Sequence, residues 1–395
     1  MRRIIAALTI FTGILSVHAG KYYDTTVDTA TTDRSIMENN DTIIKRNIIQ
    51  KIIHYFDESN DPKPSKKFDY SIVGGPTYNA STSFQLAVMG AALYHSRMDS
   101  LTPISNASVF VQGSLTGFYR VGLSGDHYGP NDAYRIRYCA DFAHFPLKFW
   151  GLGYDTECEN SNETKYTELR SALWCDFQWR IYHNLYIGPS INFRYAKATK
   201  VTRPELWYNP DTRNSTYSLG AGFIFSYDTR DISTNASSGI NLNLKQYFYP
   251  GFFKNKNPFS STELTFGIYK QAWKSGVIAT QLHAMTTYGH TPWSMMPTID
   301  ASKGIRGYYE GRYRDKNEGD IVVEIRQHIW KRIGAVAWGG VGTVFNSFND
   351  IRINTLLPSY GIGLRWEFKN KVNVRVDYGI GKRSSSICLG LYETF

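Results

Sequence analysis

Apolar and polar side chains alternate with a period of two along most of the chain from Phe68 onward. The clearest stretch runs from Val372 to Ile380, and the stretches 361–368 and 217–227 repeat the pattern. In the first stretch, one face carries Val372, Val374, Val376, Tyr378 and Ile380, and the other carries Asn373, Arg375, Asp377 and Gly379. Because the side chains of a β-strand point alternately to opposite faces, this pattern predicts strands with one apolar and one polar face.

Stretches of this kind recur along the whole chain and are joined alternately by tight turns and by longer polar loops. Sixteen strands are predicted, at 68–78, 82–95, 107–116, 118–128, 133–142, 165–180, 185–199, 217–228, 239–249, 261–273, 277–289, 319–330, 334–345, 359–369, 372–382 and 385–395. Tight turns are predicted at 79–81, 183–184, 274–276 and 370–371. The stretch 143–164, which contains Phe145-Pro146, is expected to be an extracellular loop.

The alternation alone fits either a soluble β-sandwich, with its apolar face inside, or a membrane barrel, with its apolar face outside. Strands of roughly ten residues with unequal connections are typical of outer-membrane barrels. Aromatic residues make up 15% of the chain, yet its mean hydropathy is −0.35, which fits alternating lipid-facing and lumen-facing positions. Since an open sheet edge is not viable in lipid, the sheet must close. The predicted fold is therefore all-β, a closed antiparallel transmembrane β-barrel of 16 strands.

The chain before the barrel has a different pattern. Residues 1–19 have two arginines, an apolar run and a small-residue exit, which predicts a signal peptide cleaved after Ala19. Residues 20–67 are polar and contain a short amphipathic helix at 42–58, whose isoleucines share one face. This helix either packs on its own domain or lies on the inner leaflet or the barrel mouth, in a periplasmic segment. Residues 68–395 are predicted to form the barrel.

Composition narrows the chemistry. The formal net charge is +10, but the basic residues are dispersed, so no nucleic-acid partner is expected. The nine histidines form no catalytic arrangement with serine or carboxylates, so an enzyme is not expected. The cysteines lack the close pairs of a zinc site, so neither a metal nor another cofactor is predicted, and whether they form disulfides stays open. They are Cys139, Cys158, Cys175 and Cys388.

Four stretches carry a resemblance to a known family. Ile305-Arg306-Gly307-Tyr308 lies between the eleventh and twelfth predicted strands, and Asp228-Thr229-Arg230-Asp231 ends the eighth. The third stretch combines 360–366 with 374–379, and the fourth is the terminal Phe395. In this order the stretches resemble motifs of the BamA/TamA superfamily, the bacterial surface antigen barrels, over residues 68–395. Phe395 would then be the C-terminal barrel signal.

The resemblance implies that Arg306 folds into the barrel lumen and pairs there with carboxylates of the wall. By the alternation, Glu324, Glu367 and Asp377 point inward on three strands, and a guanidinium can hold a carboxylate with two hydrogen bonds. These three residues are the candidate partners of Arg306. One departure from the family pattern is Gly340, which stands where the family has an aspartate on the thirteenth strand.

The resemblance also implies a function, namely insertion or translocation of proteins at the outer membrane of a Gram-negative bacterium, with lipid around the barrel. Segment 20–67 is too short for the periplasmic POTRA domains of the assembly members, so a POTRA-bearing or passenger protein is the expected partner. The seam would join 68–78 to 385–395, weakened by Pro76 and by Glu393 at a lipid-side position. The alternative is a passive pore or structural barrel without assembly activity.

Overall fold

A computed structural model describes residues 68–79, 83–96, 102–207, 214–252, 258–299, 301–369 and 372–395. The predicted signal peptide, the predicted helix at 42–58 and the rest of segment 20–67 lie outside the described residues and stay predictions. Within the described ranges, no helix is both long and apolar enough to cross a membrane.

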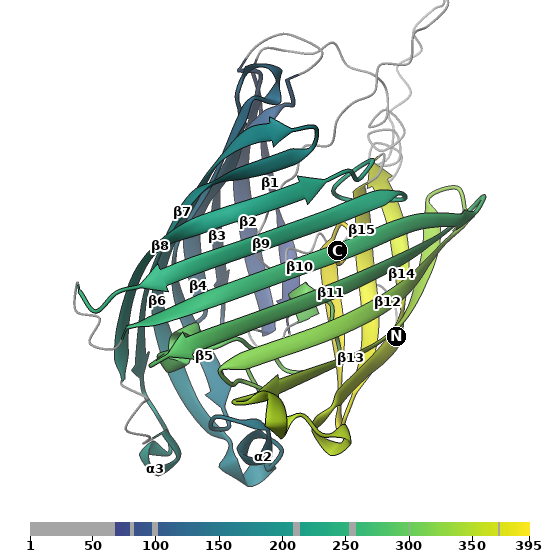
Figure 1. The fold of residues 1–395 in the computed structure, drawn as a ribbon. Coiled ribbons are helices and arrows are strands. Elements are labelled where there is room, and N and C mark those ends of the chain that lie inside the picture. The colour runs from purple at the N-terminus through teal and green to yellow at the C-terminus, as the bar shows by residue number, and fades with distance from the viewer. Residues whose placement is uncertain are drawn as a thin grey trace, which may run out of the picture.

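The described residues form one antiparallel sheet of 16 strands, in which each strand pairs with the next along the chain (Figure 1). The strands are β1 (Phe68–Asn79), β2 (Ser83–Tyr94), β3 (Ser105–Ser114), β4 (Tyr119–Tyr128), β5 (Tyr134–Phe149), β6 (Thr164–Tyr182), β7 (Leu185–Thr199), β8 (Ser215–Asp228), β9 (Gly239–Tyr249), β10 (Phe259–Trp273), β11 (Gly276–Gly289), β12 (Asn317–Trp330), β13 (Ile333–Phe345), β14 (Leu357–Lys369), β15 (Val372–Gly381) and β16 (Ser384–Leu391). The predicted number and order of strands are confirmed.

Two strands differ clearly from their predicted bounds. β5 continues to Phe149, so the prediction that a loop begins at residue 143 is wrong. β5 pairs with β4 only as far as His144 but with β6 as far as Phe149, so Pro146 lies where one edge of β5 has no ladder partner. A proline there removes no ladder hydrogen bond. The second difference, at the end of β16, concerns the site described below.

The structure decides which face of the sheet is apolar. On β12, Val323 and Ile325 are 42% and 45% exposed, whereas Glu324 and Arg326 are 0% and 7% exposed. The same inversion holds on β14, where Leu364 is exposed and its neighbour Arg365 is buried. A soluble sandwich buries its apolar face. Here the apolar face is the exposed one and the charged face is buried, which is the arrangement expected of a membrane barrel.

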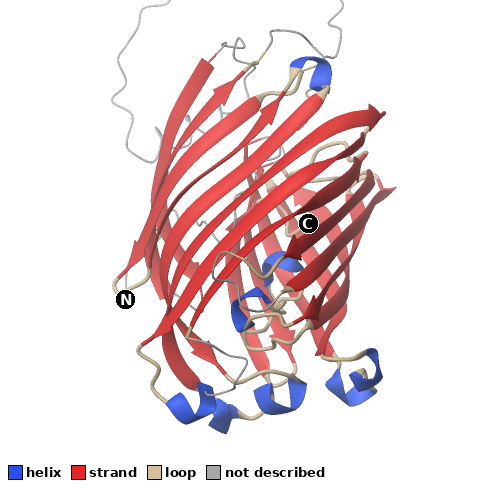
Figure 2. Ribbon diagram, turned by 60° about the vertical axis from the view of Figure 1, so that its left-hand side comes forward, coloured by secondary structure: helices blue, strands red, loops and turns tan. Residues whose placement is uncertain are grey.

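Several interstrand connections at one end of the sheet contain helical turns. α2 (Tyr154–Glu157) and α3 (Pro204–Trp207) lie at this end in Figure 1. The other helical segments are short 3₁₀ turns: η2 (Pro130–Asp132), η3 (Asn160–Asn162), η4 (Trp293–Met295), η5 (Ala301–Lys303), η6 (Phe348–Asp350) and η7 (Ile353–Thr355). Short helical turns and loops also lie inside the curled sheet (Figure 2). We call the connection between β11 and β12, residues 290–316, loop 6.

The two outer strands of the sheet approach each other. Cα atoms of β1 and β16 come within 8 Å, but no ladder joins these two strands in the part of the chain that the structure describes. The predicted tight turns near 183–184 and 274–276 are present, because Tyr182 pairs with Leu185 across the first and Trp273 pairs with Gly276 across the second. The predicted turns at 79–81 and 370–371 include residues outside the described ranges. All four cysteines are free thiols.

Candidate functional site

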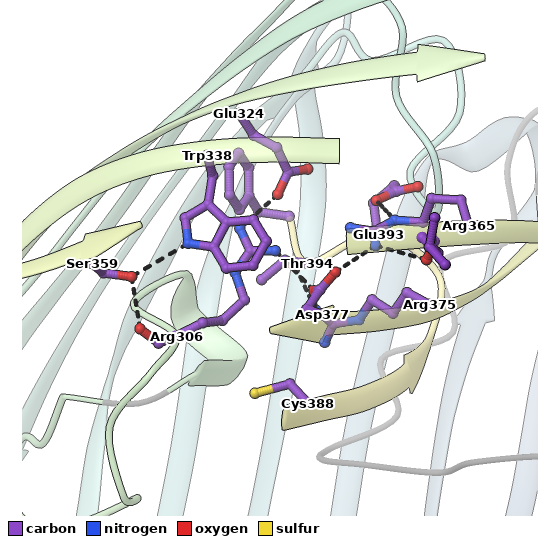
Figure 3. Close-up of polar contacts among 12 residues, drawn as sticks. Arg306, Glu324, Trp338, Ser359, Arg365, Arg375, Asp377, Cys388, Glu393 and Thr394 are labelled. Atoms are coloured by element: carbon purple, nitrogen blue, oxygen red, sulfur yellow. Dashed lines mark hydrogen bonds and ion pairs between the residues drawn. The ribbon is translucent and has the colours of Figure 1, made fainter. Parts of the chain in front are cut away.

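Loop 6 places Arg306 against the inner wall of the sheet, where its side chain is fully buried. Its Nη2 atom donates to Glu324 of β12 at 2.6 Å, and its Nη1 atom donates to Asp377 of β15 at 2.9 Å (Figure 3). Both carboxylates are themselves fully buried. Charge-assisted hydrogen bonds of this kind are about twice as strong as neutral ones, so this arginine ties loop 6 to two separate strands.

Trp338 of β13 forms a platform for the same guanidinium. The Cζ atom of Arg306 lies 3.5 Å from the centre of the Trp338 ring, and both side chains are shielded from solvent. Ser359 of β14 connects the two residues, since its hydroxyl donates to the Arg306 carbonyl at 2.7 Å and lies 3.4 Å from the indole Nε1. A desolvated cation–π contact contributes on the order of 2 kcal/mol. Four successive strands thus contribute to one binding site for Arg306.

Gly307 lets the loop backbone touch the wall. Its φ angle is +100°, and a Cβ atom at this position would lie 2.8 Å from the backbone nitrogen of Gly381. The Gly307 amide donates to Ser386 at 3.2 Å, and the Gly307 carbonyl accepts from Ser384 at 2.7 Å. Because L side chains rarely adopt this backbone conformation and no space remains for one, glycine is the residue that fits here.

Ile305 and Tyr308 fix the loop on either side of this contact. Ile305 is fully buried and packs in a cluster that includes Val322 of the wall. The hydroxyl of Tyr308 donates to the Pro358 carbonyl at 2.6 Å and accepts from the Lys382 amide at 2.7 Å. Burial raises the pKa of Tyr308 to about 12, so the phenol stays protonated near neutral pH. All four residues of the predicted motif therefore contact the wall.

Three further arginines surround the two wall carboxylates. Arg326 donates to Glu324 at 2.7 Å, and Arg365 and Arg375 donate to Asp377 at 2.5 Å and 3.0 Å. Each carboxylate therefore keeps at least one partner besides the loop arginine. Such multiply paired carboxylates stay ionised in a buried setting, because several positive charges offset the cost of desolvation.

The last residues of the chain complete this network. We call residues 392–395 the tail. Glu393 accepts hydrogen bonds from Arg365 at 2.7 Å and from Asn373 at 2.7 Å, and its side chain is 2% exposed. Thr394 contacts Arg375 at 2.5 Å, and the Phe395 carbonyl accepts from Arg326 at 2.6 Å. The tail thus binds the same wall as loop 6 (Figure 3).

The prediction that β16 runs to Phe395, with Glu393 on the lipid side, is wrong. β16 ends at Leu391, and Tyr392 has a φ angle of 64°, which breaks the extended backbone. After this break the alternation no longer applies, and the Glu393 carboxylate turns inward to Arg365. Phe395 is half-buried, with its ring centre 5.5 Å from the Arg326 guanidinium rather than in the band of exposed apolar side chains.

Known proteins resemble this chain in structure but not in sequence. No protein-family model matches the chain, and no curated protein matches it in sequence. Among solved structures, BamA from Haemophilus ducreyi lacking POTRA domains 1–3 matches with a TM-score of 0.55 at 12% identity, covering 84% of this chain and 70% of that one. The fold is that of a BamA/TamA-like barrel.

Two CdiB structures match as well. CdiB from Escherichia coli has a TM-score of 0.57 at 11% identity, covering 84% of this chain and 62% of that one. CdiB from Acinetobacter baumannii has a TM-score of 0.51 at 12% identity, covering 83% and 60%. The chain therefore spans less than two thirds of either CdiB chain. The prediction of a barrel with the fold of Gram-negative outer-membrane proteins is confirmed.

Within this BamA-like barrel, the structure brings only two of the three candidate carboxylates to Arg306. Glu324 and Asp377 pair with it, whereas Glu367 lies beside the β12–β13 turn, where its amide donates to the Arg332 carbonyl at 2.8 Å. Glu367 lies four residues along β14 from Gly363, the register partner of Asp377. Alternation predicts the face of the sheet on which a side chain lies, but not the position along the strand that a loop contacts.

The sequence interpretation missed Trp338, Arg326 and Glu393 as members of the site. Trp338 stands two residues before Gly340, the position at which the BamA-like pattern has an acid, and it shares the inner face with Gly340. At Gly340 this strand has no carboxylate, and the side chain through which it contacts Arg306 is instead the ring of Trp338. Arg326 carried a usable signal, because it follows Glu324 by two residues and so shares its face.

The rim near α2 forms a separate contact with loop 6. Glu157 of α2 is fully buried, and its Oε1 atom accepts from the Arg314 amide at 2.6 Å. Gly153 donates in turn to the Arg314 carbonyl at 2.9 Å. Burial, assisted by the nearby Asp315 charge, raises the pKa of Glu157 well above its usual range. Loop 6 is therefore held at its outer end by α2 and at its inner end by Arg306.

Proposed function

We propose that this chain is an outer-membrane barrel of a Gram-negative bacterium that takes part in inserting or translocating proteins. The observation that carries the proposal is the fully buried Arg306, which Glu324 and Asp377 hold against the wall beneath loop 6. A loop fixed in this way occupies the lumen with a defined structure. The likeness in fold to BamA and CdiB supports the same role.

The membrane part of the proposal rests on the inverted faces of the sheet. Exposed apolar side chains such as Val323 and Leu364 would contact lipid, and the closed form would join β1 to β16. In this reading the protein is recovered with the outer membrane and needs detergent for extraction. Recovery as a detergent-free monomer from the periplasm would refute membrane insertion.

The seam between β1 and β16 suggests where a client would engage. These strands approach without a ladder in the described residues, so fewer hydrogen bonds resist their separation than at the other strand pairs. Main-chain groups along such an edge can pair with an added strand. A client strand or a passenger would therefore meet the barrel at this seam, with recognition supplied by a POTRA-bearing or passenger partner.

The test is depletion of the protein in its native host, followed by quantitative proteomics of the outer membrane. We expect the loss of other barrel proteins or of one exported passenger, restored by the wild-type gene and restored only in part by Arg306→Ala. An outer-membrane proteome that does not change on depletion would refute the proposal. Large, stable openings in planar bilayers, together with that unchanged proteome, would instead identify a passive pore.

A further inference from the structure

A second group of charged residues lies on the inner wall under loop 6, away from Arg306. His283 of β11 pairs in register with Asp320 of β12, and its Nδ1 atom lies 3.6 Å from an Asp320 oxygen and 3.3 Å from Glu318. Its Nε2 atom lies 3.1 Å from Glu263 of β10. Lys303 of loop 6 approaches Glu318 at 3.6 Å. We call these five residues the His283 cluster.

The cluster has more buried negative charge than its partners satisfy. The side chains of His283, Glu318 and Asp320 are 3%, 0% and 1% exposed. Neither carboxylate oxygen of Asp320 accepts a hydrogen bond, and Oε2 of Glu318 accepts none either. A buried ionised carboxylate without a partner is costly, and such groups in proteins are normally paired or coordinate a metal. The three carboxylates face Lys303 and His283, and Lys245 of β9, the register partner of Glu263, forms its ion pair with Asp176 at 3.2 Å.

We propose that His283, Glu318 and Asp320 bind a divalent transition-metal ion such as Zn²⁺. One ligand atom from each residue lies within 4.8 Å of the others. Ligand atoms about 2.0–2.2 Å from a tetrahedral ion lie about 3.3–3.6 Å from one another, so the site closes with side-chain shifts of about 1 Å. The imidazole ligand selects Zn²⁺ and its neighbours in the transition series over Ca²⁺ and Mg²⁺, which take oxygen ligands.

Glu263 prepares the histidine for this role. If the Nε2–H group donates to Glu263, the Nδ1 lone pair is left pointing at Glu318 and Asp320. A carboxylate behind a ligating histidine is the usual arrangement at protein metal sites, because it fixes the tautomer and raises the basicity of the ligand. The two remaining carboxylates and Nδ1 then form a three-sided site with its open side toward loop 6.

Lys303 occupies that open side and acts as the competing cation. Its carbonyl accepts a hydrogen bond from Gln281 of β11 at 2.5 Å, which holds the loop backbone independently of the ammonium group. Lys303 precedes Arg306 by three residues in loop 6. An arriving metal ion therefore displaces the ammonium and leaves the loop backbone bound. Removing this side chain should tighten metal binding, which a merely structural ion-pair cluster would not predict.

The experiment is titration of the full chain in detergent with Zn²⁺ by calorimetry, and with Co²⁺ by absorption spectroscopy. We expect one saturable ion per chain, bound at least about tenfold more weakly by His283→Gln and Asp320→Asn and more tightly by Lys303→Met. His328→Gln removes an exposed histidine at the β12–β13 turn and is the matched control, with unchanged affinity.

Three results would overturn the proposal. They are no saturable binding by the wild type, equal affinity in His283→Gln and wild type, or a thiolate-to-cobalt charge-transfer band, which would assign the ion to the free cysteines. Folding of each variant is checked by its heat-dependent migration on gels. Asp320→Asn keeps the test decisive if His283→Gln fails to fold. The outcome does not depend on the proposed role in protein insertion.

Discussion

Arg306→Ala should release loop 6 from the wall while leaving the sheet folded. The substitution removes the bonds to Glu324 and Asp377, at 2.6 Å and 2.9 Å, and the stacking on Trp338. Breaking a buried ion pair costs about 3–5 kcal/mol. The expected cost lies at the lower end of this range, because Arg326 still pairs with Glu324 after the change.

Loss of about 3 kcal/mol shifts the ratio of docked to released loop by more than about 100-fold. Hydrogen exchange of the amides in loop 6 measures this shift directly in the detergent-solubilised protein, since local opening sets the exchange rate. Heat-dependent gel migration reports separately on the sheet, which should unfold at a lower temperature but still form. Arg306→Lys keeps the charge but has no planar fork, so it should give an intermediate result.

The matched control is Arg203→Ala. Arg203 is 46% exposed and pairs with an exposed Glu205, and surface pairs of this kind contribute about 0–1 kcal/mol. Its loss should leave exchange in loop 6 unchanged. Wild-type protection of loop 6 in Arg306→Ala would refute the reasoning, as would an equal loss of protection in Arg203→Ala.

Three further changes test other parts of the structure. Gly307→Ala should weaken loop docking by about 1–3 kcal/mol, whereas Gly319→Ala, with nothing within 4 Å of its added Cβ, should not; amide exchange in loop 6 compares them. Glu393→Gln should cost about 1–3 kcal/mol and expose the tail amides to exchange, and unchanged protection would contradict this. Because the folded-state pKa of Glu157 is raised, the docking of loop 6 on α2 is strongest below about pH 4.3 and weakens as pH rises. Protection of the Arg314 amide from exchange should follow this trend. In Glu157→Gln the protection should not depend on pH.

The sheet could be predicted because its signal is repeated along the chain. The side-chain period of two found all sixteen strands and assigned Glu324, Arg365 and Asp377 to one face. The same period could not decide whether that face is inside, since a sandwich and a barrel share it. The exposed fractions of neighbouring residues in the structure settled this point.

The candidate site was predictable only in part. The motif around Arg306 indicated a loop contact, and two of its three expected partners are present. Glu393 was misplaced because the left-handed residue Tyr392 ends the extended backbone, so strand alternation does not apply to the tail, and no pattern in the sequence marks that break. Trp338 was missed because stacking depends on the path of loop 6 through the interior, which strand periodicity does not contain.

Arg365 donates both to Asp377, which binds Arg306 of loop 6, and to Glu393 of the tail, so this arginine connects the two binding sites. Two ligands that share an anchor are thermodynamically linked, and the linkage is reciprocal. Removal of the tail from its site would change how Arg365 binds Asp377, and therefore how Asp377 binds Arg306 of loop 6. A pull on the end of the last strand would therefore change the stability of loop 6 docking through this arginine.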